Sequence, residues 1–216
     1  ASALAACPEG GEVLVVDDAS TPPAAEALAG IGDPRLRVIR NDGPRGASGA
    51  RNHGVAADRH DLVFFLDDDD EILPDYCDRI IASVAKMADY GFAPVALRIG
   101  DAPAVFPPAG ASGPLGAEAP LRKYLAGLGA GFWIHRAAYL AAGGLDPAQV
   151  VDEDTDLCCR LVAAGRRAFR SGTPGTVVSR ARTDGAEAGQ LTATSNTPMG
   201  AACYQRTYLR NWPALA

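Results

Sequence analysis

Two apolar segments that each end in consecutive acidic residues constrain the fold more than any other feature of this sequence. Residues 11–18 read GEVLVVDD and residues 61–70 read DLVFFLDDDD. Short apolar runs of this kind predict buried strands, and a segment with helical spacing, from about Ser48, lies between them. Strands that alternate with helices predict an α/β fold, with a mainly parallel sheet covered by helices on both faces.

The rest of the chain continues this alternation. Residues 101–120 are rich in Pro, Ala and Gly and predict a loop, and residues 183–200 have little apolar content and predict a mobile segment. Further strands are expected at residues 35–41, 95–100 and 172–182, and helices at residues 24–30, 74–91, 152–165 and 201–212, while residues 121–144 predict a helix, a short strand and a second helix. In the helix at 74–91, Pro74 would lie in the first turn and Gly91 would end it.

The acidic strand ends predict a ligand site. In open parallel sheets, ligands bind beyond the carboxyl ends of the strands, so Asp17, Asp18 and the run Asp67 to Asp70 would line one crevice. Four adjacent carboxylates repel one another. A solvated turn is the alternative, but the run directly follows LVFFL, so its first acids should be partly buried. Mg²⁺ or Mn²⁺ would relieve the repulsion, because these ions take oxygen ligands, and we expect a metal site here.

Two further clusters could contribute to this site. Glycines around Arg45 and before Arg51 would let backbone N–H groups approach an anion at the start of a helix, although such a loop is weak evidence alone. A third acidic cluster, Asp152-Glu153-Asp154, opens the helix at 152–165. Asp152 suits an N-cap. Glu153 and Asp154 are candidates for chemistry, because an Asp at a helix start could accept a proton from a hydroxyl.

Composition excludes several classes of protein. The formal net charge of −6 argues against a nucleic-acid-binding surface. The five cysteines are odd in number and lack CxxC or Cys/His metal spacing, which predicts reduced thiols in a cytoplasmic protein. No apolar run reaches the length of a membrane span. Peripheral association with the inner face of the membrane stays compatible with the sequence, which does not set an oligomeric state.

Four segments, taken in order, resemble the family 2 inverting glycosyltransferases, which have the GT-A fold. They are VLVVDDAST, GPRGASGARNHGVAAD, FFLDDDDEILPD and GGLDPAQVVDEDTDLCCRLVAAG. Each motif alone is modest, but the four together span roughly residues 11–170. The resemblance implies transfer of a sugar from a nucleotide-diphosphate sugar, usually a UDP-sugar, to an acceptor hydroxyl in one inverting displacement. It also implies Mn²⁺ or Mg²⁺ as cofactor and a carbohydrate, lipid-linked or polysaccharide acceptor.

The resemblance implies a nucleotide pocket around the first two segments. Asp18 would contact the nucleotide base, with Asp17 behind it. Arg51 would lie near the base or the diphosphate, and Gly46 would line the pocket.

The third segment resembles the family's DxD motif. Asp69 would bind the metal, while Asp67 and Asp68 would face the ribose and the waters of the metal, with Asp67 close enough to be a second ligand. Asp70 would be structural.

The fourth segment and a stretch before it imply the acceptor side. Glu153-Asp154 resembles the family's ED pair, in which Asp154 would be the general base. Phe132 and Trp133 occupy a stretch that often borders the acceptor, and Trp133 could stack on a sugar, although core positions are an equally good interpretation of both.

On this basis we expect one domain over residues 1–216. Residues 1–100 would form a nucleotide-binding half, residues 101–182 an acceptor-side half, and residues 183–216 the mobile segment and a final helix.

Two departures from the family accompany the resemblance. Family members begin with a strand and a helix before the VVDD strand, and the first ten residues resemble only the end of that helix, so we expect the strand to lie outside the printed residues. Some members also place a His near the metal where this sequence reads VVSRARTDG. Arg180 or Arg182 could meet the diphosphate there, or could be solvated.

Other classes fit less well. A phosphorelay receiver also has a VVDD strand, but it needs a single acceptor Asp and a Lys at a strand end, and neither Lys86 nor Lys123 is expected at one. A nucleotidyltransferase would need a Gly-rich amino-terminal loop with Arg and Lys, which is not visible. A catalytically weak or inactive nucleotide-binding protein of the same fold stays an alternative, and the Asp at position 154 argues against it.

Overall fold

The structure of the protein is a computed structural model that describes residues 1–216 apart from residues 85, 117–118, 130, 181–196 and 216. Its helices are α1 (Ser2–Ala6), α2 (Ala24–Ala27), α3 (Ala47–Ala57), α4 (Tyr76–Ser83), α5 (Arg136–Ala141), α6 (Glu153–Ala163) and α7 (Pro198–Leu215), with a 3₁₀ turn at Leu121–Lys123. Its strands are β1 (Val13–Asp17), β2 (Leu36–Arg40), β3 (Leu62–Phe64), β4 (Glu71–Ile72), β5 (Tyr90–Phe92), β6 (Val95–Ile99), β7 (Gly113–Pro114), β8 (Trp133–His135), β9 (Ala168–Arg170) and β10 (Thr176–Arg180).

In the described part of the chain, the strands form three sheets, in the orders β1-β2, β4-β10-β6 and β3-β8-β5-β9-β7. The pairs β1/β2, β6/β10 and β5/β9 are parallel, and β8 runs antiparallel to both β3 and β5. The predicted α/β fold is confirmed. Antiparallel neighbours accompany the parallel pairs: β4 pairs with β10, and β7 pairs with β9.

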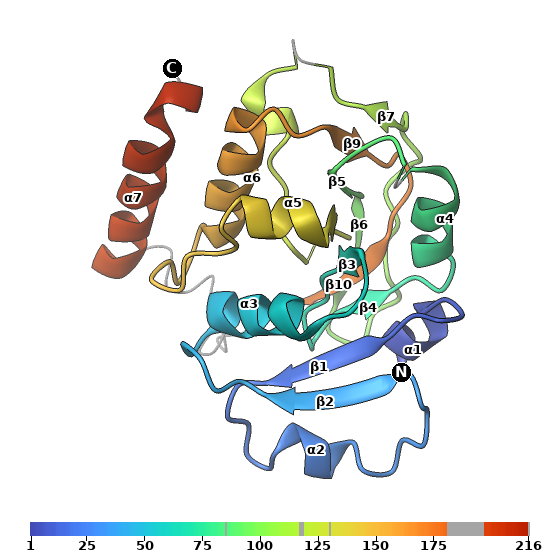
Figure 1. The fold of residues 1–216 in the computed structure, drawn as a ribbon. Coiled ribbons are helices and arrows are strands. Elements are labelled where there is room, and N and C mark those ends of the chain that lie inside the picture. The colour runs from blue at the N-terminus through green and yellow to red at the C-terminus, as the bar shows by residue number, and fades with distance from the viewer. Residues whose placement is uncertain (85, 117–118, 130, 181–196, 216) are drawn as a thin grey trace.

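The β1–β2 pair carries the first acidic cluster. Its register aligns Val13 with Leu36 and Asp17 with Arg40. Helix α3 lies along β1 (Figure 1), at a spacing that a glycine permits: a Cβ at Gly54 would lie 3.0 Å from a methyl of Val16. Among the described residues β1 has only β2 as a hydrogen-bonded neighbour.

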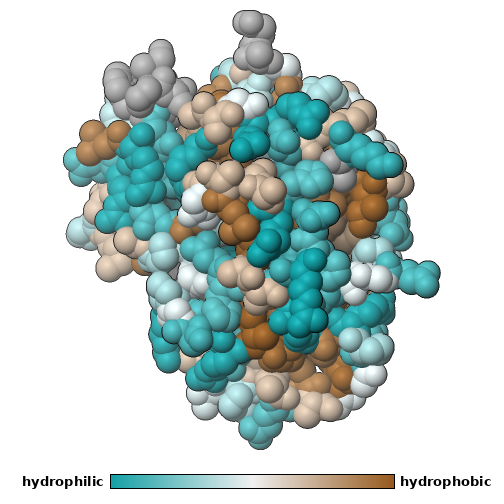
Figure 2. All heavy atoms as spheres, viewed as in Figure 1, coloured by the Kyte–Doolittle hydropathy of each residue, from teal (hydrophilic) through white to brown (hydrophobic). Residues whose placement is uncertain are grey.

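The core holds β8 and α6 in place. Phe132, Ile134, Leu157 and Leu161 are all fully buried in one apolar cluster. A second cluster gathers around Tyr76 and the strand residues that face α4. Since the apolar face of α6 packs in this cluster, the core fixes the position of Glu153 and Asp154 in the first turn of the helix. On the face shown in Figure 2, hydrophilic residues are interspersed with smaller hydrophobic areas.

Several expected elements need correction. The helix expected at 74–91 ends at Ser83, and Gly91 lies inside β5, where a Cβ would come within 2.6 Å of the Trp133 ring. Within residues 121–129 the structure has a 3₁₀ turn at Leu121–Lys123 in place of the expected helix. Strand β9 was not expected, because three residues are too few to show a period. The final helix is confirmed as α7.

Other expectations concern the whole chain. All five cysteines are free and four of them are buried, which agrees with the predicted reduced thiols. None of the helices in the described part of the chain combines the length and the apolar content needed to cross a bilayer. Most of the segment expected to be mobile lies outside the described residues. The three-part division of the chain and the cytoplasmic location stay predictions.

Candidate active site

Arg51 connects the second and third acidic clusters. It lies on α3, and its guanidinium donates a hydrogen bond of 2.6 Å to Asp67 at the end of β3 and one of 2.9 Å to Glu153 at the start of α6. The Arg51 side chain is only 17% exposed. Burial opposes its charge, but the two carboxylates outweigh that effect and raise its pKa. Segments that are 102 residues apart in sequence therefore meet at one cation.

Asp154 is a carboxyl whose charge is disfavoured. It is half-buried in the first turn of α6, and burial together with the neighbouring Glu153 raises its pKa to about 6. The backbone N–H of Thr155 donates to it at 2.7 Å and partly offsets that rise. A carboxyl with a pKa near neutrality can take up a proton during a reaction. The burial and the raised pKa of Asp154 suit a general base.

Asp17 and Asp18 organise the loop that precedes α3. Asp17 is buried and accepts hydrogen bonds from the N–H groups of Ser20 and Ala24, and these bonds, with Arg40 nearby, lower its pKa to about 2. Asp18 accepts from the Gly46 N–H at 2.7 Å, which brings the glycine loop against the end of β1. Both carboxylates therefore accept backbone N–H bonds, Asp17 from a buried position and Asp18 from a half-buried one.

A glycine-rich segment runs past both reactive clusters. A Cβ at Gly127 would lie 3.3 Å from Asp154 Oδ2, and one at Gly129 would lie 3.0 Å from Asp67 Oδ2. Thr176 on β10 donates to the Gly129 carbonyl and holds the segment in place. The absence of side chains here lets the backbone lie directly against the carboxylates.

The acids after β3 differ in exposure. Asp70 is buried and accepts from the Ser179 N–H at 2.9 Å, and its burial raises its pKa, which agrees with the structural role expected for it. Asp68 and Asp69 are exposed and Asp67 is half-buried. Within the described ranges no three His, Cys, Asp or Glu side chains converge as a preformed metal cluster. The carboxylates present suit Mg²⁺ or Mn²⁺ only where a ligand supplies further oxygens.

Comparison with known proteins identifies the family. The model of glycosyl transferase family 2 matches residues 1–137. This chain belongs to glycosyl transferase family 2. The chain is 46% identical over 70 residues to the succinoglycan biosynthesis protein ExoO of Rhizobium meliloti, covering 32% of this chain and 20% of that protein. It is 32% identical over 171 residues to the pre-mycofactocin glycosyltransferase of Mycobacterium tuberculosis, covering 73% of this chain and 35% of that protein.

Solved structures support the GT-A fold of this family 2 chain. S. aureus TarS in complex with UDP-GlcNAc matches with a TM-score of 0.67 and 16% identity, over 90% of this chain and 56% of that one. GalNAc-T7 with UDP, GalNAc and Mn²⁺ matches with a TM-score of 0.63 and 16% identity, over 84% of this chain and 40% of that one. The chain thus spans between a fifth and about a third of the curated relatives above.

Two residues expected at the acceptor side of this glycosyltransferase fold are fully buried. Phe132 and Trp133 are both 0% exposed, and each packs in one of the two apolar clusters. This burial favours the alternative that both are core residues. A place for them beside the acceptor stays a prediction.

The remaining expectations have mixed outcomes. Asp152 occupies the N-cap of α6 but with a left-handed φ of 66° and no capping hydrogen bond from its side chain, so its expected capping role is not seen. Arg180 is exposed and donates to the adjacent Ser179 carbonyl, and Arg182 lies outside the described residues.

Sequence reasoning missed three residues that lie against the candidate site residues. Asn41 directly follows β2 and donates to Asp18 at 2.7 Å and to the Pro44 carbonyl, so it ties the two sides of the loop together. A polar residue at a strand end was the available signal. Gly127 and Gly129 carried the signal of alternating glycines in GLGAG, which we took as part of a helix.

Proposed function

We propose that this domain transfers a sugar from a UDP-sugar to a hydroxyl of a glycan acceptor, in one inverting displacement with Asp154 as general base. The observation that carries the proposal is the state of Asp154: half-buried, with its pKa raised to about 6, in a cluster that Arg51 links to Asp67. The family match and the likeness to folds solved with UDP-sugar support the donor class.

Residues of this chain would position the acceptor and carry out the proton transfer. Asp154 would hold the acceptor hydroxyl and take its proton as the oxygen attacks the anomeric carbon. Attack from the face opposite the leaving diphosphate inverts that centre. Arg51 donates to both Glu153 and Asp67, and so would hold the proposed base and the donor end of the site at a fixed separation.

The nucleotide would bind at the loop between β1 and α3. The Asp18 carboxylate is fixed by Asn41 and the Gly46 N–H, and it would accept a hydrogen bond from the base. Asp17 would support this contact from behind by holding the turn at Ser20. Asp68 would face the ribose.

Asp69 and Asp67 would hold a divalent cation, Mn²⁺ or Mg²⁺, together with oxygens of the diphosphate and water. Sites with one or two carboxylates and substrate phosphates are typical of these ions, and the exposed Asp69 fits this pattern. A bound cation supplies charge neutralisation for the departing diphosphate. GalNAc-T7, which shares the fold, was solved with Mn²⁺.

The test is Asp154→Asn. An amide cannot accept the proton, so release of UDP from UDP-sugars in the presence of acceptor should fall by at least about a hundredfold, while UDP affinity by calorimetry stays unchanged. Asp152→Asn is the matched control, since it is also acidic, lies two residues away and has no capping bond. Near-normal turnover of Asp154→Asn would remove Asp154 as the base. Nucleotide binding without sugar transfer by the unaltered protein would favour a binding protein of the same fold.

A further inference from the structure

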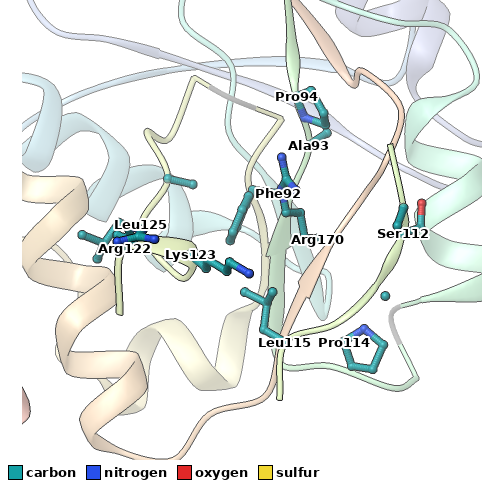
Figure 3. A pocket seen from close by; sticks show the side chains of 13 residues that line it. Phe92, Ala93, Pro94, Ser112, Pro114, Leu115, Arg122, Lys123, Leu125 and Arg170 are labelled. Carbon is teal, nitrogen blue, oxygen red and sulfur yellow. The ribbon is translucent and has the colours of Figure 1, made fainter. Parts of the chain in front are cut away.

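A pocket away from the acidic clusters is lined by basic and apolar side chains. It has a volume of about 660 Å³ and lies between the β5–β6 turn, the segment around β7, residues 122–126 and β9. Figure 3 shows Arg122 and Lys123 on one side, Ser112 and Pro114 on the other, and Phe92, Leu115 and Arg170 between them. The pocket is thus built from segments that neither the nucleotide loop nor the DxD segment uses.

Three basic side chains line this pocket in a protein of net charge −6. Arg122, Lys123 and Arg170 are exposed, and none of their side chains forms a hydrogen bond or ion pair with another residue in the described part of the chain. By contrast, Arg35, Arg37 and Arg51 are each paired with a carboxylate. Three cations around one hollow, without a carboxylate partner among the described residues, attract an anionic group.

The floor between these cations is apolar. Phe92, Leu115 and Leu125 line the pocket together with alanine and proline side chains. Aromatic and aliphatic surfaces of this kind contact the C–H faces of sugar rings, while the cations beside them bind a charge. Their combination favours a ligand that carries both, such as a sugar with a carboxylate or phosphate group.

The pocket adjoins the proposed base. The segment Arg122 to Ala126 forms one wall, and the carbonyl of Ala126 accepts a hydrogen bond of 3.8 Å from the Cys158 thiol of α6. The next residue, Gly127, lies against the Asp154 carboxylate. A chain of sugars with its reacting hydroxyl at Asp154 could therefore run along this wall into the pocket.

We propose that this pocket binds an anionic substituent, a carboxylate or a phosphate ester, on the glycan acceptor, and that it selects acidic glycans over neutral ones. The proposal rests on the proposed function. Arg122, Lys123 and Arg170 hold the charge at a distance from the reacting hydroxyl and take no part in the chemical step. They are specificity residues for the acceptor.

The experiment measures equilibrium binding, so that it does not depend on turnover. The probes are a galacturonic acid trisaccharide, maltotriose with a terminal 6-phosphate, and neutral maltotriose. We expect the two charged probes to bind about five- to tenfold more tightly than maltotriose at low salt, as expected for a few exposed charge pairs, and the difference to shrink in 0.5 M NaCl, where the screening length falls to about 4–5 Å. The ratio of the first two probes distinguishes a carboxylate from a phosphate site.

The triple variant Arg122→Gln, Lys123→Gln, Arg170→Gln should lose this difference. Arg59→Gln should keep it, because Arg59 is an exposed arginine outside the pocket and has no ion pair with a described residue. Equal binding of charged and neutral probes would overturn the proposal, as would a triple variant that still prefers the charged probes or an equal loss in Arg59→Gln. Since all the substituted residues are exposed, circular dichroism should show unchanged folding. Failure of the proposed function would show separately, as undiminished turnover of Asp154→Asn.

Discussion

The acid at the end of β1 and the acid at the start of α6 are the same residue type in opposite electrostatic states. Asp17 accepts two backbone N–H bonds beside Arg40, and its pKa is lowered to about 2. Asp154 accepts one such bond, and burial beside Glu153 raises its pKa to about 6. Hydrogen bonds to the charged form explain the first shift and loss of solvent explains the second.

This difference in pKa separates an acid suited to a structural role from one suited to proton transfer. An acid that stays ionised at every physiological pH can hold a turn permanently, as Asp17 holds Ser20 and Ala24. An acid that gains and loses its proton near neutrality can take part in proton transfer, as proposed for Asp154. Arg51 belongs with the proposed reactive acid, because its positive charge lowers the pKa of Asp154 and so limits the rise caused by burial.

The largest effect is expected from Arg51→Ala. The substitution leaves Asp67 and Glu153 without their shared cation in a site where Arg51 is 17% exposed, and breaking such pairs costs about 2–4 kcal/mol of unfolding free energy. It should also raise the pKa of Asp154 further, which would enlarge the contrast with Asp17. Urea denaturation gives the free energy, and the midpoint of the pH–rate profile reports the pKa.

Arg40→Ala is the control for Arg51→Ala, because Arg40 also pairs with an aspartate but is 53% exposed. An exposed pair of this kind contributes about 0–1 kcal/mol. Equal losses in the two variants would contradict the view that Arg51 holds the clusters together.

The second effect is a gain in stability for Asp154→Asn. The pKa of Asp154 is higher in the folded protein than in the unfolded chain, so its ionisation is less favourable in the fold. At pH 7.5 the carboxyl is ionised in both states, and its charge therefore lowers the free energy of unfolding. Removing that charge should raise the unfolding free energy by about 1–3 kcal/mol at pH 7.5. The gain should vanish below pH 4, and thermal unfolding at both pH values measures it. A loss of stability at pH 7.5 would show that the charge is favoured in the fold.

The sequence predicted where both acids lie in the secondary structure but did not predict their pKa values. VLVVDD and the DEDTDL helix start are local patterns, and so β1 and α6 were found within a few residues. The raised pKa of Asp154 was not predictable, because it depends on burial, and the carboxylate lies close to the distant Gly127. The sequence left Phe132 and Trp133 open between core and acceptor for the same reason: their burial depends on packing against residues from distant segments, which leaves no local signal.

The third effect concerns the scaffold acid. In Asp17→Asn one of the two acceptor oxygens becomes an NH₂ group, which cannot accept a hydrogen bond. One of the two bonds from the N–H groups of Ser20 and Ala24 is therefore lost, and the protein should be destabilised at pH 7. Because the folded pKa of Asp17 is lowered to about 2, this stabilisation is complete above pH 4 and is lost as the pH falls toward 2. The difference between variant and parent in urea midpoints should therefore shrink between pH 4 and pH 2. Asp101→Asn, an exposed acid without such bonds, should show no difference at any pH.

The smallest effect is expected from Gly127→Ala, which alters the reactive acid through its surroundings alone. The new methyl would lie 3.3 Å from Asp154 Oδ2, a distance at which the carboxylate must shift slightly or lose contact with water. Further loss of solvent should raise the pKa of Asp154 and lower the rate at pH 6 by about twofold, with little change at pH 8, where the base is ionised in either protein. Gly32→Ala, where nothing lies within 4 Å of the added methyl, controls for the effect of Ala on the chain itself. A rate that fell equally at both pH values would mean that the methyl obstructs the acceptor and leaves the charge of Asp154 unaltered.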